Sequence, residues 1–272
     1  MQMGYEILFF WMARMILMST YALDQIPFKD VYIHGMLRNE LGKKFSKSSG
    51  NNVDPLEVAA KFGTDALRLS LISGIAPGND SRFYEEKIEG ARNMVNKLWN
   101  VGRYIITNYE LSITNNELNI KNLTAADEWI LKNFQILVKA VTIDLENYNF
   151  SQAAEKLREF TWNLLADWYL EVCKFEQTDN KNEILSYLLI NLLKLWHPFI
   201  PFITEAIRTE IGFKKMLIIE DWPKLYKILD AKDNCFEEII QIIQDIRNER
   251  ARRKIDLSKK IRYNYYIFFY IF

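Results

Sequence analysis

The stretch Gly42-Lys43-Lys44-Phe45-Ser46-Lys47-Ser48-Ser49-Gly50-Asn51 holds three lysines and three serine hydroxyls between two glycines. Lysine acts as a point charge on a flexible stem. A loop of this composition therefore suits a polyphosphate whose negative charge grows during a reaction. On composition alone, the alternative is a charged surface loop without a ligand. The segments on either side of the loop decide between the two interpretations.

Short elements with clear boundary signals flank this loop. Residues 31–34, Val-Tyr-Ile-His, predict a short buried strand that ends at Gly35. Beyond the loop, Asp54 is a candidate N-cap and Pro55 a candidate first helical residue. This second element is expected to be a helix that stops near Gly63, with another helix starting at once.

From about residue 85 onward the chain is helical in character, because apolar residues recur at helical spacing. A polar break is expected at 114–122, and His-Pro-Phe-Ile-Pro at 197–201 interrupts the later helices. Further helices are predicted over 129–147, 151–173, 184–196, 203–211 and 236–252. The chain is therefore predicted to be mainly α.

The two ends of the chain are unusually apolar. Residues 4–15 are apolar except for Glu6 and Arg14, charges that argue against a secretory signal or a membrane span. A buried helix is the prediction for this segment. Residues 263–272 read either as a buried terminal strand or as a segment foreign to the rest of the fold.

Composition excludes several kinds of site. The 272 residues carry 35 Lys and Arg against 35 Asp and Glu, so nucleic acid would have to be bound by local patches. Two cysteines and two histidines, all far apart, exclude a zinc cluster, a disulfide framework and a Cys–His nucleophile pair. A reducing, cytoplasmic setting is the expectation.

The loop and its flanks resemble the class I aminoacyl-tRNA synthetases. Residues 44–48 are similar to the Lys-Met-Ser-Lys-Ser signature of that family, with Phe45 in place of Met. Residues 27–35, 50–55 and 65–68 match the surroundings of that signature. Within the family the resemblance favours the valyl-tRNA synthetases, and it extends over roughly residues 3–261. Its further matches are residues 4–15, 166–171, 197–205 and 246–251.

The resemblance implies a mainly α chain in two parts. The first is the C-terminal remnant of a class I Rossmann-type α/β catalytic domain, and the second is an all-α anticodon-binding helical bundle. The expected segments are residues 1–75 for the catalytic part, 76–122 for a connecting helical segment, 123–225 for the bundle, and 226–272 for a C-terminal helix with an atypical hydrophobic tail.

The resemblance also implies roles for individual residues. Lys47 and Lys44 are expected to be catalytic, and no residue is expected to bind a metal. ATP, together with Mg²⁺, would be held by Lys47, Lys44, Ser46, His34, Gly35 and Glu6. Glu6 stands where the family has an Asp that holds the ribose hydroxyls. Ile7 and Trp11 would line an apolar pocket for the valine side chain.

Other residues have less specific roles. Trp162, Trp168, Trp196 and His197 are expected to be structural, like the two cysteines. The basic run at residues 247–254 is either a solvated helix face or a contact for tRNA phosphates.

One element of the family's site is absent from this sequence. There is no His-Ile-Gly-His, the element that contacts the ATP phosphates opposite the lysine loop. The chain is therefore interpreted as a valine–tRNA ligase fragment that is inactive alone, with valine, ATP and the tRNA for valine as partners and no membrane. The alternatives are half of a split enzyme completed by a separate chain, a stand-alone tRNA-binding helical module, and a fragment of an isoleucine- or leucine-type synthetase.

Overall fold

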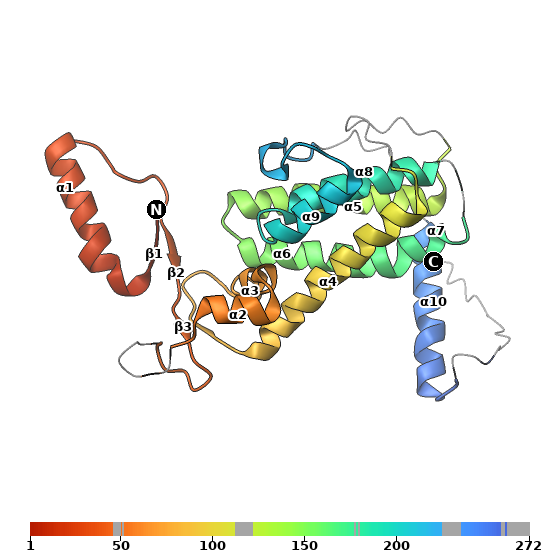
Figure 1. Ribbon diagram of the computed structural model, residues 1–272, viewed down its shortest axis with the longest axis horizontal. Helices are drawn as coiled ribbons and strands as arrows, with labels where there is room; N and C mark the ends of the chain where they lie inside the picture. Colours follow the sequence, from red (N-terminus) through yellow and green to blue (C-terminus); the bar gives the residue numbers. More distant parts are fainter. Residues whose placement is uncertain are drawn as a thin grey trace, which may run out of the picture. The chain divides into compact units, whose positions relative to one another are not determined.

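The computed structural model describes residues 1–45, 50, 52–111, 122–176, 178, 180–224, 235–256 and 259. The chain divides into two compact units, Met1–Asp230 and Ala231–Phe272. Helices dominate the described residues of both units and the strands are short (Figure 1), so the prediction of a mainly α chain is confirmed. The polar break at 114–121 and the tail at 263–272 lie outside the described residues, as do Ser46 and Lys47.

The strands of the first unit form two parallel pairs. β1 (Gln2–Gly4) pairs with β2 (Tyr32–His34), which confirms the predicted strand, but the strand is half-buried rather than buried. β3 (Leu37–Arg38) pairs with β4 (Ser81–Arg82). Parallel neighbours require a crossover connection. Between β1 and β2 this is η1 (Tyr5–Ile7), the π-helix η2 (Leu8–Met12) and α1 (Ala13–Leu23), so the N-terminal segment is a β-helix-β unit.

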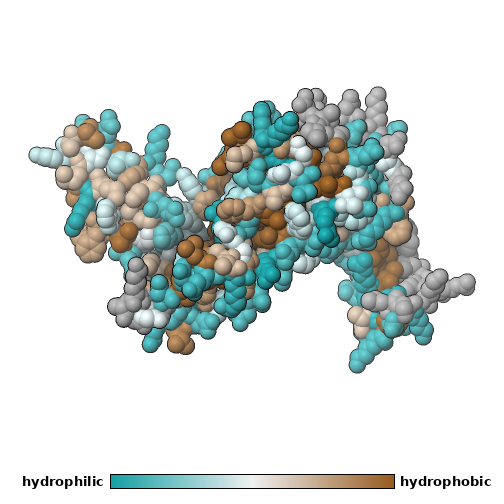
Figure 2. Space-filling view, viewed as in Figure 1, coloured by the Kyte–Doolittle hydropathy of each residue, from teal (hydrophilic) through white to brown (hydrophobic). Residues whose placement is uncertain are grey.

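The crossover is a helix as predicted, but the prediction that it is buried is wrong. Phe9 is 76% exposed, Trp11 58%, Leu17 69% and Tyr21 90%. The reason is that α1 packs mainly on its own continuation η2, so its apolar surface is left uncovered (Figure 2). Tyr5–Leu23 is also long and apolar enough to cross a membrane by length and composition, a test that core helices of soluble proteins pass too.

The helices after the lysine loop begin and end where the sequence predicts. In α2 (Pro55–Phe62) the Asp54 carboxylate accepts a hydrogen bond from the Leu56 amide at 2.8 Å, so Asp54 is the N-cap. Gly63 ends α2 with a φ of +97°, a conformation that favours glycine. α3 (Thr64–Ser70) follows directly.

The core lies in the helices that come next, and their bounds agree closely with the predicted ranges. Figure 1 shows the long helices lying side by side. Their buried side chains are mostly aliphatic and aromatic, including Leu98, Phe134, Leu188 and Trp196. The elements are α4 (Glu85–Asn108), α5 (Ala125–Glu146), α6 (Phe150–Glu159), the π-helix η4 (Phe160–Tyr169), α7 (Leu170–Cys173), α8 (Asn180–Trp196), α9 (Pro201–Ile211) and η5 (Leu217–Ile219).

Helix α3 is fastened to the break between α8 and α9. The Asp65 carboxylate accepts hydrogen bonds from the amides of Phe202 and Ile203, so it caps α9 from a distant part of the chain. Arg68 donates to the carbonyls of Pro198 and Phe199, both at 3.2 Å. The first amides of a helix have no partner within it, and Asp65 satisfies two of them in α9, while Arg68 binds carbonyls of the connection between the two helices.

The second unit contains one described helix, α10 (Cys235–Arg252). It confirms the predicted helix over 236–252. It is acidic in its first turn, at Glu237 and Glu238, and basic in its last, at Arg250 and Arg252. The charges at both ends therefore interact favourably with the helix dipole and stabilise the helix.

Candidate functional site

The carboxyl ends of β1 and β2 lie next to each other, because the two strands are parallel and in register. In open α/β folds ligands bind beyond these ends. β1 leads into Tyr5 and Glu6, and β2 ends at His34 and Gly35. The sequence-predicted residues Glu6, His34 and Gly35 are therefore brought to one edge of the sheet.

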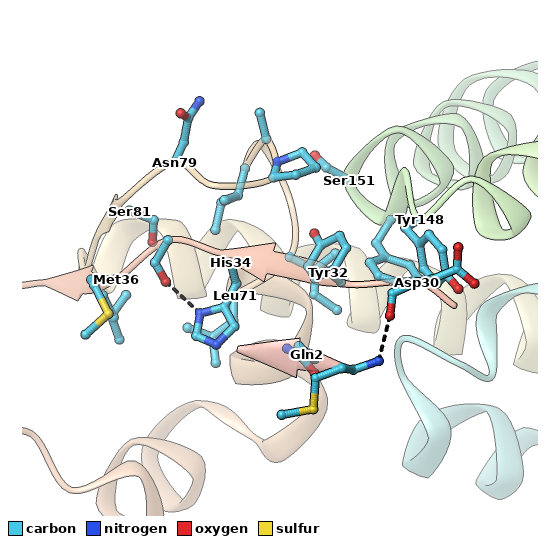
Figure 3. Close-up of a pocket in the computed structure, with 18 residues that line it drawn as sticks. Gln2, Asp30, Tyr32, His34, Met36, Leu71, Asn79, Ser81, Tyr148 and Ser151 are labelled. Carbon is cyan, nitrogen blue, oxygen red and sulfur yellow. Dashed lines mark hydrogen bonds between the residues drawn. The ribbon is translucent and has the colours of Figure 1, made fainter. Parts of the chain in front are cut away.

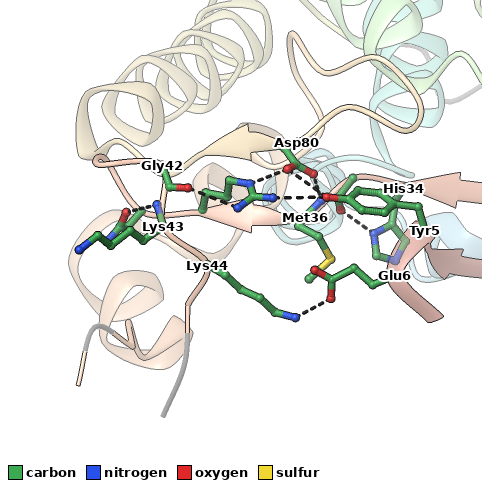
Figure 4. Close-up of polar contacts among 11 residues, drawn as sticks. Tyr5, Glu6, His34, Met36, Gly42, Lys43, Lys44 and Asp80 are labelled. Carbon is green, nitrogen blue, oxygen red and sulfur yellow. Dashed lines mark hydrogen bonds and ion pairs between the residues drawn. The ribbon is translucent and has the colours of Figure 1, made fainter. Parts of the chain in front are cut away.

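An ion pair joins this edge to the lysine loop. The Lys44 ammonium lies 2.5 Å from a carboxylate oxygen of Glu6 (Figure 4). The two residues are 38 positions apart, and their side chains are 53% and 33% exposed. Two residues assigned to nucleotide binding from the sequence thus contact each other directly, and both remain accessible to a ligand.

Asp80 is the shared acceptor of the polar contacts next to this pair. One of its carboxylate oxygens accepts from the Met36 amide at 2.7 Å. The other accepts from the Arg38 guanidinium at 2.5 Å and from the Tyr5 hydroxyl at 3.2 Å (Figure 4). The hydrogen bond from the Met36 amide, and then the one from Arg38, lower the pKa of Asp80 below its usual value. Asp80 is therefore charged at neutral pH and holds three segments together.

The start of the lysine loop is a tight turn. The Asn39 side chain accepts from the Lys43 amide, and Gly42, with a φ of +77°, donates its amide to the Asn39 carbonyl. Arg38 and Lys44 form an antiparallel bridge across the turn. At the described end of the loop, the Phe45 ring packs edge-on against Phe83, with centroids 6.2 Å apart. Phe45 therefore packs against the residue that follows β4.

Gly35 lies in a very close backbone contact. A β-carbon at this position would be 1.9 Å from the carbonyl oxygen of Asn79, a distance that no side chain can adopt. The loop that carries Asp80 therefore lies directly on the end of β2. The His34 ring nitrogen Nδ1 is 2.8 Å from the Gly35 carbonyl oxygen.

A cavity of about 650 Å³ opens beside β2 (Figure 3). Its aromatic wall comes from Tyr32, Tyr148 and Phe150, whose rings contact one another. Gln2, His34 and Asn79 add polar groups to the lining. Neither Ile7 nor Trp11 lines this cavity; both are exposed, at 41% and 58%. Their assignment to a valine pocket stays a prediction.

Sequence reasoning missed Asp80, Arg38 and Tyr5. The only local signal is that residues 73–80 are rich in turn-forming residues, a pattern that predicts a turn and not a site. Nothing in the local sequence pairs Arg38 with a residue 42 positions away. Within the described residues no group of three or more His, Cys, Asp or Glu side chains could hold a metal ion.

The bundle holds a buried charged network of its own. The Lys181 ammonium is 2.5 Å from an Asp127 carboxylate oxygen, and the Tyr169 hydroxyl donates to the same oxygen at 2.7 Å. All three residues are at most 1% exposed. Nearby, burial raises the pKa of the Cys173 thiol to about 11, so the thiol stays protonated, as expected of a structural cysteine.

The other residues expected to be structural lie in packing positions. The Trp196 indole donates to the Thr161 hydroxyl at 3.0 Å, and the Lys97 ammonium lies 4.9 Å from the Trp162 ring centroid. The His197 ring is 2.9 Å from the Thr204 hydroxyl, and burial lowers its pKa. His197 is therefore neutral at pH 7.

The basic run at the end of α10 is partly neutralised within its own helix. Glu249 accepts hydrogen bonds from both Arg252 and Arg253, and these bonds lower its pKa to about 2. Arg250 donates to the carbonyls of Asp256 and Lys259. A contact between this run and tRNA phosphates stays a prediction.

Two protein-family models match the chain. Residues 127–265 match the anticodon-binding domain of tRNA ligase, and residues 1–83 match tRNA synthetases class I (I, L, M and V). The chain is 41% identical over 269 residues to a valine–tRNA ligase of Clostridium acetobutylicum and 40% identical to one of Clostridium tetani. Each match covers 95% of this chain but about 30% of the relative, so the chain spans under a third of these relatives' length.

Solved structures of the same class have a similar fold. The LeuRS of Agrobacterium radiobacter K84, in a ternary complex with tRNA and LeuAMS, matches with a TM-score of 0.64 at 21% identity, over 92% of this chain and 33% of that one. A methionyl-tRNA synthetase of Mycobacterium tuberculosis with methionyl-adenylate matches with a TM-score of 0.62 at 20% identity, over 86% and 49%. With the family matches, these likenesses confirm the predicted fold class.

Proposed function

We propose that this chain, which belongs to the class I tRNA ligases with an anticodon-binding domain, serves the valine–tRNA ligase reaction. In that reaction valine, ATP and tRNA give valyl-tRNA, AMP and pyrophosphate. The observation that carries the proposal is the match of about 40% identity to valine–tRNA ligases, which extends over both halves of the chain. The contact between Glu6 and Lys44 at the carboxyl ends of β1 and β2 supports it independently.

The proposed nucleotide site uses the residues at this edge. Lys44 and Lys47 would neutralise the phosphates as charge builds on them, and the Ser46 hydroxyl from the same loop would donate a hydrogen bond to them. Glu6 would accept hydrogen bonds from the ribose hydroxyls, and His34 with Gly35 would lie beside the adenine. Mg²⁺ would arrive bound to the nucleotide phosphates, because the described residues offer no cluster of metal ligands.

A bound nucleotide would replace the direct contact between Glu6 and Lys44, and both side chains would bind it from the positions that they already occupy at this edge of the sheet. An ion pair that is this exposed is weak, about 0.2–1 kcal/mol, so a polyphosphate can displace it at little cost. Ile7 and Trp11 would contribute the valine pocket. An apolar pocket suits this substrate, and it distinguishes one methylene by only about 10–200-fold.

The helical bundle is proposed to bind the tRNA for valine. The family match over residues 127–265 includes the bundle and α10. The chain as a whole has no net charge, so binding would rely on local cations such as the run at 247–254. The setting proposed for this activity is the cytoplasm.

A second candidate is that the chain works as one half of a two-chain enzyme. The exposed apolar side chains of η2 and α1 support this, since patches of this kind mark interaction surfaces. Among the described residues β1 and β2 form a sheet of two strands, and parallel sheets are normally covered on both faces. The partner would be an α/β chain that brings a strand and the missing His-Ile-Gly-His.

Valine-dependent exchange of pyrophosphate into ATP, measured with the purified chain, tests the enzymatic role. We expect no exchange from the chain alone. We expect exchange after a polypeptide with the remaining part of the valine–tRNA ligase sequence is added. Exchange by the chain alone would show that it needs no second half. Failure of the mixture, with both parts folded, would overturn the two-chain proposal.

Binding of tRNA tests the bundle separately. We expect the chain to bind tRNA with a valine anticodon more tightly than the same tRNA with that anticodon replaced. Binding with no exchange under any condition would favour a stand-alone tRNA-binding module. Exchange that depends on isoleucine or leucine instead of valine would assign the chain to those synthetases.

A further inference from the structure

Asp80 contacts three segments that are far apart in the sequence. It precedes β4, and its carboxylate accepts from the Met36 amide before β3, from the Arg38 side chain within β3 and from the Tyr5 hydroxyl in η1. Two of these partners, Tyr5 and Arg38, also contact each other at 3.4 Å. The carboxylate is therefore the shared acceptor of a small polar network (Figure 4).

Each arm of this network leads to one member of the Glu6–Lys44 pair. Tyr5 is the chain neighbour of Glu6 in the 3₁₀ turn η1, so fixing the Tyr5 hydroxyl limits where Glu6 can lie. Arg38 donates to the Gly42 carbonyl at 3.4 Å and forms the backbone bridge to Lys44. The two members of the pair are thus held through separate partners of the same carboxylate.

The backbone around Asp80 supports this arrangement. The Ser81 amide donates to the Met36 carbonyl and the Phe83 amide donates to the Arg38 carbonyl, at 3.0 and 2.8 Å. Just before Asp80, the Asn79 carbonyl lies against Gly35. The Asp80 backbone therefore has little freedom to shift, and its carboxylate has a defined position relative to the end of β2.

We propose that Asp80 is a positioning residue for the nucleotide site, acting through Tyr5 and Arg38 to bring Glu6 and Lys44 together. The identity of the ligand as a nucleotide rests on the proposed function. The positioning of Glu6 and Lys44 by Asp80 rests on the contacts described above. Asp80 contacts neither Glu6 nor Lys44 in any hydrogen bond that the structure shows, so its effect on them is indirect. Loss of its charge should free Lys44 while the helical bundle stays folded.

The test is the acylation rate of individual lysines in the full chain, treated with N-hydroxysuccinimide acetate and followed by peptide mass spectrometry. In the native chain Lys44 should react more slowly than Lys43, whose side chain forms no ion pair among the described contacts. In Asp80→Asn we expect Lys44 acylation to rise about two- to fivefold, the range that an exposed ion pair can supply. Tyr5→Phe, which removes only a hydroxyl, should raise it by a smaller factor.

Lys97 provides the internal reference, because its ammonium is paired with Asp167 at 3.0 Å and neither residue is a partner of Asp80. Its rate should be unchanged in Asp80→Asn, whereas Asp167→Asn should raise the rate of Lys97 and leave Lys44 as it was. A global loss of structure would raise both rates in either variant. Unchanged Lys44 acylation in Asp80→Asn, with Lys97 also unchanged, would overturn the proposal.

Added ATP separates this inference from the proposed function. We expect ATP to slow Lys44 acylation in the native chain and to require about two- to fivefold more nucleotide to do so in Asp80→Asn. If ATP protects Lys44 in neither protein, the nucleotide role of the site fails, while the rates without ATP still decide whether Asp80 positions the pair. If ATP protects both proteins equally well, Asp80 does not serve the nucleotide site.

Discussion

The lysine-loop region and the helical bundle both contain a Lys–carboxylate pair with a nitrogen–oxygen distance of 2.5 Å, but in opposite surroundings. Lys181 and Asp127 are at most 1% exposed and share a further donor, Tyr169. Lys44 and Glu6 are half- and one-third exposed. The bundle therefore uses its ion pair as part of a closed core, whereas the loop region keeps its charges where a ligand can reach them. Identical distances have different consequences because burial sets the cost of separating the charges.

Substitution of Lys181 is the strongest test of this difference. Lys181→Met should lower the free energy of unfolding by about 3–5 kcal/mol, because it leaves the Asp127 carboxylate buried without its cation. Thermal and urea unfolding, monitored by circular dichroism, measure the change. Lys61→Met is the matched control, since Lys61 and Glu85 also pair but are more than half exposed. If both variants lose the same free energy of unfolding, burial does not determine how much an ion pair contributes to stability.

Substitution of Gly35 tests whether close backbone packing in the loop region contributes to the stability of the chain, as the buried core does in the bundle. Gly35→Ala should destabilise the chain by about 1–3 kcal/mol, the usual cost of forcing extra atoms into a packed site, because the new β-carbon meets the Asn79 carbonyl. Gly90→Ala is the control: Gly90 lies in α4 with open space around it. There alanine should stabilise the helix by about 0.5–1 kcal/mol. The midpoints of denaturant unfolding measure the stability of both variants. If Gly35→Ala is as stable as the native chain, the loop that carries Asn79 can move away at no cost.

His197 gives the bundle a pH dependence. Burial lowers its pKa below the ordinary 6.5, so the unfolded state binds a proton first as the pH falls. The stability contribution is complete above 6.5 and is lost as the pH drops from there towards the folded-state pKa. We expect the melting temperature to fall between pH 7 and pH 5, and His197→Gln to show a smaller fall. Parallel pH profiles of the two proteins would exclude His197 as the source.

The two regions also differ in how far the sequence could predict them. The helices after the lysine loop follow from apolar spacing and caps such as Asp54, which are local signals. The partners of Asp80 are 42 to 75 positions away, and no local pattern indicates them. The apolar character of η2 and α1 predicted the helix correctly but not its exposure, because burial depends on neighbours rather than on the segment itself. The family resemblance assigns Lys44 and Glu6 to one nucleotide site, but neither it nor the local sequence predicts their direct contact.

The exposed pair gives the smallest expected effect and completes the comparison. Lys44→Met should change the free energy of unfolding by about 0–1 kcal/mol, because water solvates the Glu6 carboxylate once the ammonium is gone. The same variant should weaken ATP binding, since it removes one of the cations that the phosphates would use. Unfolding midpoints and nucleotide titrations of one protein sample measure both. If Lys44→Met lowers the free energy of unfolding about as much as Lys181→Met, Lys44 is a structural residue. That result would weaken the case for a binding site at this edge of the sheet.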